Sequence, residues 1–346
     1  MTFEERRRQQ FMGEANYRAE LALWDEVLAG QRENLTKPEG GERGWHLSMH
    51  QGIAEGLLNQ FLLHYTAGEL IEPLRGELEE IVAAYERYGE YLWKYTGDRN
   101  EPVFGFVVMD EYCQLMQLIG LCFLLHRRDL LPRLAALQDG LDAVGQDGEG
   151  NGGTDTLYEE FMAHGLGPES RYESDWLCCT KPYAALFHAM TETSNATRLK
   201  ELNIFLKHWY KDLAGTGWHD AHITDEDGNQ GGYYGYWSFE AGAAVILLGI
   251  EDDSSLHKYL YYPKDLVAWS RENAARFSDG GPGDGASRSR PNVPAGQPCP
   301  EAGWWFTPAK QDSRRYFKQG ETMPDVGSDY GITFWQWSQD QSAPKL

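Results

Sequence analysis

Residues 71–95 read IEPLRGELEEIVAAYERYGEYLWKY, and this stretch decides the fold class. Its apolar residues recur at alternating spacings of three and four, at Ile71, Leu74, Leu78, Ile81, Tyr85, Tyr88, Leu92 and Tyr95. That period places them on one face of an α-helix, and Gly97 supplies a C-terminal stop. A stripe of this kind is far more often core packing than a cofactor site, so it predicts a helix packed against other helices.

The same period predicts helices on both sides of this stretch. Thr2 and Glu5 form a capping box, and the face that follows (Tyr17, Leu21, Trp24, Leu28) is expected to end at Gly30. Residues 110–126 are apolar on most sides, which predicts a buried central helix. Later helices are expected at about 155–163, 182–192, 197–212, 233–248 and 263–277. The predicted fold is all-α, a multi-helix bundle of amphipathic helices around a buried central one.

Two stretches rich in glycine suggest boundaries, at 144–153 and 278–300. They divide the chain into an N-terminal helical domain (1–143), a C-terminal helical domain (154–277) and a linker with an aromatic-rich tail (278–346). The tail is expected to be irregular and to pack on the helical body, because so many aromatic side chains would not be left in water. Truncation at Ala286 is then expected to give an unstable or aggregating protein.

The net charge of the chain indicates which kinds of partner it can bind. The 346 residues include 31 basic and 53 acidic ones, a formal net charge of −22. This argues against nucleic acid, whose phosphates need facing Lys and Arg, and favours encounter with a basic protein. The simpler interpretation, a solvated acidic surface, stays open.

Other features favour the cytoplasm. The N-terminus, MTFEERRRQQ, has no apolar core of a secretory signal, and the longest apolar run, Leu118–Leu125, is too short to span a membrane. The five cysteines form no C-x-x-C pair, so neither a disulfide framework nor a zinc site is indicated.

Two groups of residues have side chains that could carry chemistry. His219 and His222, followed by Asp225, Asp227 and Asn229, resemble metal ligands, but the distal Glu of a calcium loop is missing. A polar hairpin loop is the simpler interpretation, so no metal and no cofactor are expected.

Glu240 lies in an aromatic setting that could raise its pKa, and with Asp220 or Asp265 it could form the carboxylate pair of a glycosidase. The simpler interpretation is a buried Glu that ties two helices together. The chain has neither a G-x-S-x-G elbow nor a phosphate-binding loop.

Acidic residues near predicted loops are the candidates for contact with a basic partner. We single out two groups, Asp220, Asp225, Glu226 and Asp227 in one loop and Glu251, Asp252 and Asp253 in another.

Three segments in order carry a resemblance to a known family. They are Gly232-Tyr-Tyr-Gly-Tyr-Trp-Ser-Phe-Glu240, Gly249-Ile-Glu-Asp-Asp-Ser-Ser-Leu256 and Tyr261-Tyr-Pro-Lys-Asp-Leu266. Together they resemble the C-terminal domain of the PoNi family, immunity proteins that neutralise polymorphic nuclease toxins in bacteria. The tail, from Gly303-Trp-Trp-Phe to Phe334-Trp-Gln-Trp337, resembles a tail of other polymorphic-toxin immunity proteins.

The resemblance implies an all-helical, non-enzymatic protein that binds a co-encoded toxin, as in type VI secretion and interbacterial competition, and blocks its active site. It also implies a structural role for the motif residues Tyr236, Trp237, Glu240, Tyr261, Tyr262, Pro263 and Asp265. The complex is expected to be 1:1 or 2:2, which leaves a homodimer open. The alternatives are a glycan-active enzyme built on Glu240 and a helical scaffold without a toxin partner.

Overall fold

The computed structural model describes residues 2–38, 44–138, 155–168, 176–224, 226, 230, 232–277, 293–307, 310, 313–326 and 333–338. Its helices are α1 (Phe3–Arg6), α2 (Glu14–Leu35), α3 (Trp45–Thr66), α4 (Ile71–Thr96), α5 (Met109–Leu124), α6 (Leu131–Gln138), α7 (Thr156–Leu166), α8 (Thr180–Thr191), α9 (Asn195–Asp212), α10 (Phe239–Leu247) and α11 (Lys264–Phe277). Short 3-10 turns lie between some of these helices, including η1 (Arg128–Leu130) and η3 (Ser254–Leu256). The all-α prediction is confirmed for this body. The predicted boundary at 144–153 lies outside the described residues.

The helix predicted from residues 71–95 is α4, and its stripe is buried from Ile71 to Tyr85 and becomes exposed toward Tyr95. Gly97 ends it with φ +76°, a left-handed conformation that glycine adopts without steric cost. The predicted central helix is α5, which is buried on nearly all sides, from Leu115 to Leu124 above all.

Two helix boundaries differ from the prediction. α2 continues through Gly30 to Leu35, because a single glycine in an exposed helix costs only about 1 kcal/mol. Residues 233–238 are not helical, and α10 begins only at Phe239. Gly235 lies at φ +107°, which breaks any helix there.

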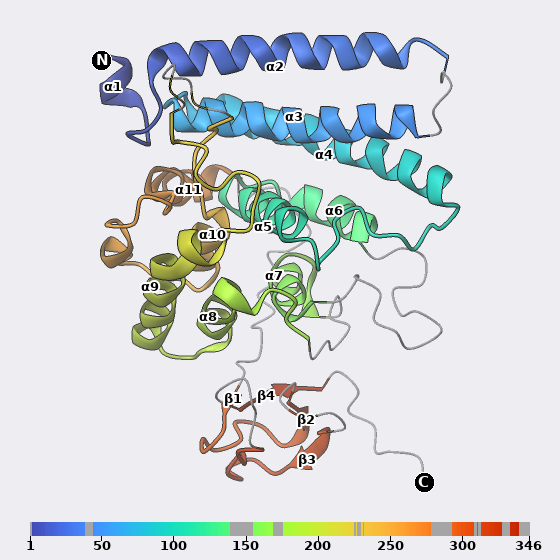
Figure 1. Ribbon diagram of the computed structural model, residues 1–346. Helices are drawn as coiled ribbons and strands as arrows, with labels where there is room; N and C mark the ends of the chain where they lie inside the picture. Colours follow the sequence, from blue (N-terminus) through green and yellow to red (C-terminus); the bar gives the residue numbers. More distant parts are fainter. Residues whose placement is uncertain are drawn as a thin grey trace.

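The helices form layers around α5 (Figure 1). α2, α3 and α4 lie side by side as an outer layer, and α8 and α9 pair on the other side. α10 packs along α5 at close range, since a Cβ added to Gly120 would lie 2.7 Å from the backbone nitrogen of Glu240. One continuous hydrophobic core runs from Phe3 to Val267, so the two predicted helical domains do not have separate cores.

The tail contains a sheet that the sequence did not predict. Strands β1 (Val293–Pro294), β2 (Gly303–Phe306), β3 (Arg315–Phe317) and β4 (Phe334–Trp337) form an antiparallel sheet in the order β1-β4-β2-β3. The expectation of an irregular tail is therefore wrong.

The buried aromatic residues of this tail do not join the helical core. They form a second cluster of their own, made of Val293, Cys299, Trp305, Phe317, Met323 and Trp335. In Figure 1 the sheet lies below α7 and α8, at the far side of the body from α2. The expectation that the tail buries its aromatic side chains on the helical body is wrong, because the sheet buries them itself.

Candidate partner-binding surface and the buried motif beneath it

The segment 233–238 has no regular secondary structure, and one side chain from the N-terminal segment holds it in place. The Gln9 amide donates to the carbonyls of Tyr236 (2.5 Å) and Leu260 (3.1 Å). Its oxygen accepts from the Tyr236 amide (2.9 Å) and from the Tyr233 hydroxyl (2.6 Å). Gln9 is buried, so these bonds satisfy polar groups that water cannot reach. The N-terminal segment thereby fixes the motif, a role for which its sequence gives no signal.

Trp237 is anchored to the end of α3. Its indole N–H donates to the Thr66 hydroxyl (2.8 Å), which donates to the Tyr234 carbonyl (2.6 Å). Gly235 makes this possible, because a Cβ there would lie 2.0 Å from the Thr66 hydroxyl. This close approach explains the glycine between two tyrosines of the motif.

Glu240 is buried at the start of α10 with 1% of its surface exposed. One carboxyl oxygen accepts from the Trp209 indole N–H at 2.9 Å, while the other has no hydrogen-bond partner among the described residues. Burial raises the pKa of Glu240 to about 7, although bonds from its own amide and from Trp209 act in the opposite direction. The carboxyl group therefore ties α9 to α10.

Further aromatic rings gather around Trp209, the partner of this carboxyl group. Trp209 stacks on Trp218 with ring centroids 5.2 Å apart, and Tyr210 lies almost parallel to Tyr261 at 5.4 Å. His222 accepts or donates a bond of 2.8 Å with the Tyr236 hydroxyl. Trp209 and Tyr236 belong to the continuous core, and Tyr210, Trp218 and Tyr261 pack against it.

The remaining motif residues position α11. Pro263 comes directly before this helix, where its fixed φ is suited to a helix start, and packs on Gly242 of α10. Tyr262 is buried and its hydroxyl donates to Asp253. Asp265 is half-exposed and faces the Arg8 guanidinium at 3.4 Å.

Asp253 does not belong to an exposed acidic surface as the sequence suggested. It is 5% exposed and pairs with Arg271 at 2.9 Å. Burial alone would raise its pKa, but the bonds from Tyr262 and Arg271 outweigh burial and leave the pKa below its ordinary value. Its charge is neutralised inside the protein, so a partner cannot reach it.

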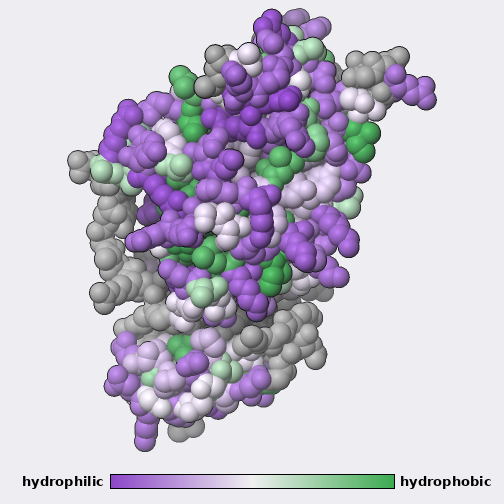
Figure 2. Space-filling model, turned by 90° about the vertical axis from the view of Figure 1, so that its left-hand side faces the viewer, coloured by the Kyte–Doolittle hydropathy of each residue, from purple (hydrophilic) through white to green (hydrophobic). Residues whose placement is uncertain are grey.

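The other candidate acids that the structure describes are exposed. Glu226, Glu251 and Asp252 lie at the surface, and Asp252 accepts from the Ser254 amide at 3.0 Å. Asp220 adopts φ +62° and accepts from the Tyr210 hydroxyl at 2.6 Å, a bond that lowers its pKa. Asp225 and Asp227 lie outside the described residues. Figure 2 shows that the face carrying α9 and α11 is covered mostly by hydrophilic residues.

A recess of about 240 Å³ lies near the aromatic cluster, between α3, α5 and the segment 232–237. Among the described residues that line it, Asp110 is the one carboxylate. This carboxylate accepts a hydrogen bond of 3.0 Å from the Gly217 amide. Glu240 does not line the recess. A glycosidase needs two carboxylates facing the same open cleft, so this geometry does not favour the glycan-active alternative.

The described residues contain no group of three His, Cys, Asp or Glu side chains arranged to hold a metal ion. Within the same residues, no helix combines the length and the apolar run that a membrane crossing requires.

Comparison with known proteins finds one family model and one similar solved structure among the matches. Residues 153–266 match the family model described as PoNe immunity proteins (PoNi), C-terminal, which confirms the resemblance inferred from the motif. The fold is similar to the crystal structure of protein PA2201 from Pseudomonas aeruginosa, with a TM-score of 0.56 and 20% identity. That likeness covers 78% of this chain and 92% of the other, and at this identity it concerns the fold alone. No curated protein matches this chain in sequence.

Proposed function

We propose that this protein is a cytoplasmic immunity protein that binds a co-encoded bacterial toxin, a nuclease effector, and occludes its basic active site. The family match of residues 153–266 carries this proposal. The interface would be the exposed acidic loops with Asp220, Glu226, Glu251 and Asp252, extended by Asp225 and Asp227. No catalytic step and no cofactor belong to this role.

Electrostatics supports the same proposal. A nuclease needs a basic cleft to bind its phosphate-rich substrate. A chain with a net charge of −22 attracts such a cleft at long range and repels nucleic acid. The motif residues, buried or paired within the body, would then hold the acidic loops in place without touching the toxin.

Co-expression with the neighbouring toxin gene tests the proposal. We expect restored growth of a toxin-expressing strain and a stable complex of the two purified proteins. If the toxin-expressing strain does not recover and the two purified proteins form no complex, the proposal is contradicted.

Charge reversal tests the interface. The double variant Glu226→Lys with Glu251→Lys should slow association roughly tenfold at low salt, and less at high salt, because screening weakens steering. The matched control is Glu26→Lys with Glu90→Lys, which makes the same change of net charge at exposed positions of α2 and α4. Equal association rates for both double variants, measured by stopped flow, would exclude these loops as the interface.

A further inference from the structure

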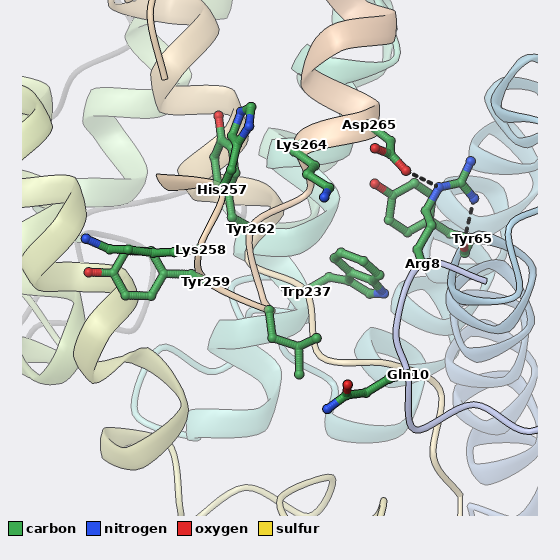
Figure 3. A pocket seen from close by; sticks show the side chains of 11 residues that line it. Arg8, Gln10, Tyr65, Trp237, His257, Lys258, Tyr259, Tyr262, Lys264 and Asp265 are labelled. Carbon is green, nitrogen blue, oxygen red and sulfur yellow. Dashed lines mark hydrogen bonds and ion pairs between the residues drawn. The ribbon is translucent and has the colours of Figure 1, made fainter. Parts of the chain in front are cut away.

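A second pocket, of about 270 Å³, lies where the N-terminal segment meets the start of α11 (Figure 3). Its floor and walls are aromatic and rigid: Tyr65, Trp237 and Tyr262 are each at most 3% exposed. Three of its lining side chains, Arg8, Lys258 and Lys264, are cationic and one, Asp265, is anionic. A net positive lining is unusual in a chain with a net charge of −22.

The buried Tyr65 hydroxyl has no hydrogen-bond partner within the described residues. Tyr65 itself is 0% exposed. Figure 3 shows this hydroxyl directed into the pocket. The Leu266 amide is near enough to affect its pKa but forms no hydrogen bond of ordinary geometry, and burial, the larger effect, keeps the phenol protonated. An unpaired buried donor costs free energy that an acceptor in the pocket would recover.

Two further features favour a negatively charged acceptor. The ammonium group of Lys264 forms no ion pair or hydrogen bond with the residues that the structure describes, and Figure 3 shows its side chain reaching into the pocket toward Trp237. The pocket also lies at the start of α11, a helix of 14 residues whose first-turn amides face this end.

The remaining charges limit the ligand to a single negative charge. The guanidinium of Arg8 is occupied, since it donates to the carbonyls of Tyr65 (2.6 Å) and Glu69 (3.0 Å) and faces Asp265 at 3.4 Å. Lys258 lies over the ring of Tyr259, 5.0 Å from its centroid. Lys264 is then the lining cation with neither an ion pair nor a ring contact among the described residues, and beside Asp265 it suits a monoanion better than a phosphate dianion.

We propose that this pocket binds a carboxylate that carries an apolar or aromatic stem. The carboxylate accepts from the Tyr65 hydroxyl and the Lys264 ammonium group, and the stem packs against Trp237. The size agrees, because a cavity of about 150 Å³ already holds a benzene ring. The carboxylate comes either from a free small molecule or from a side chain or C-terminus of a bound protein.

The test uses the whole protein and two matched probes, 4-phenylbutyrate and its neutral amide, followed by calorimetry and by the indole N–H resonance of Trp237. We expect the carboxylate to bind at least tenfold more tightly than the amide. Tyr65→Phe and Lys264→Met should each weaken carboxylate binding about tenfold, while Lys207→Met on the exposed face of α9 should not. Equal binding of both probes, or unchanged binding by both pocket variants, would overturn the proposal.

A stability measurement provides a second, independent test. Because the Tyr65 hydroxyl has no hydrogen-bond partner among the described residues, Tyr65→Phe should leave the free energy of unfolding of the protein alone unchanged or raise it. A clear loss of stability would mean that the protein itself satisfies the hydroxyl, and would overturn the proposal.

Saturating toxin distinguishes the two sources of the carboxylate. Loss of probe binding assigns the pocket to a carboxylate of the partner, and simultaneous binding assigns it to a free small molecule. Probe binding is measured first on the protein alone, so a failure there is separate from any failure of toxin neutralisation.

Discussion

At the scale of single residues, the Glu240 carboxyl group makes stability depend on pH. Its pKa rises from 4.5 to about 7 on folding, so its stabilising contribution is full below pH 4.5 and is lost as the pH rises through about 7. We expect wild type to lose up to roughly 3 kcal/mol relative to Glu240→Gln between pH 4.5 and 8, at about 1.4 kcal/mol per pKa unit. Urea unfolding followed by tryptophan fluorescence measures this difference.

Burial also raises the pKa of buried Asp155 and of half-buried Glu111, and the comparison of wild type with Glu240→Gln separates the effect of Glu240 from theirs. Exposed Glu226→Gln is the matched control and should run parallel to wild type. If the free energy of unfolding of Glu240→Gln also changes with pH in parallel with wild type, the Glu240 carboxyl group is already ionised in the folded protein at pH 5.

Glu240 also shows which contacts a single sequence can predict and which it cannot. Its aromatic neighbours in sequence predicted a buried Glu that ties helices together, and the structure agrees. Its partner Trp209 is 31 residues away, and no local pattern names it. Asp253 was assigned to the surface because it follows Glu251 and Asp252, yet Arg271 reaches it through the fold. Pairings of this kind depend on tertiary contacts, which one sequence does not specify.

At the scale of elements, the contact between α5 and α10 depends on Gly120. A Cβ there would lie 2.7 Å from backbone atoms of Phe239 and Glu240, and backbone cannot move aside as a flexible side chain can. Gly120→Ala should therefore lower the free energy of unfolding by about 1–3 kcal/mol, despite the better helix propensity of alanine.

The matched control is Gly76→Ala in α4, an exposed helical position with nothing within 4 Å of the new Cβ. It should raise the free energy of unfolding by about 0.5–1 kcal/mol. Urea midpoints of the two variants should move in opposite directions. Stabilisation by both would mean that α10 does not pack closely on α5.

The elements themselves were predictable where the period was long. The stripe of residues 71–95 is sufficient for α4, since eight apolar positions on one face leave few alternatives. The helix predicted from residue 233 is wrong for residues 233–238, because the Tyr and Trp side chains there suit a helix face, an irregular segment and a strand alike. What excludes the helix is the left-handed Gly235 against Thr66, a contact with a distant helix.

At the scale of the whole molecule, the sequence predicted that aromatic side chains of the tail are buried, but it placed them against the wrong neighbours. Aromatic density in the tail correctly predicted that some of these rings are buried, namely Trp305, Phe317 and Trp335, whereas Tyr316 is 51% exposed. It did not show that they bury one another, because short strands with few residues carry a weak period. Trp305 and Trp335 are now seen in a cluster separate from the helical core.

This separation reverses the expected effect of truncation. A chain that ends at Phe277 keeps the whole continuous core from Phe3 to Val267, as well as the ring contact of Phe277 with His126. We expect it to unfold cooperatively, with a midpoint within a few degrees of the full chain, because the sheet contributes no residue to that core. Circular dichroism at 222 nm on both chains measures this.

A chain that ends at Leu256, which lacks Tyr262, Leu266 and Val267 of the core, is the control that should fail to fold. Aggregation of the 277-residue chain as well would show that the sheet stabilises the helical body after all.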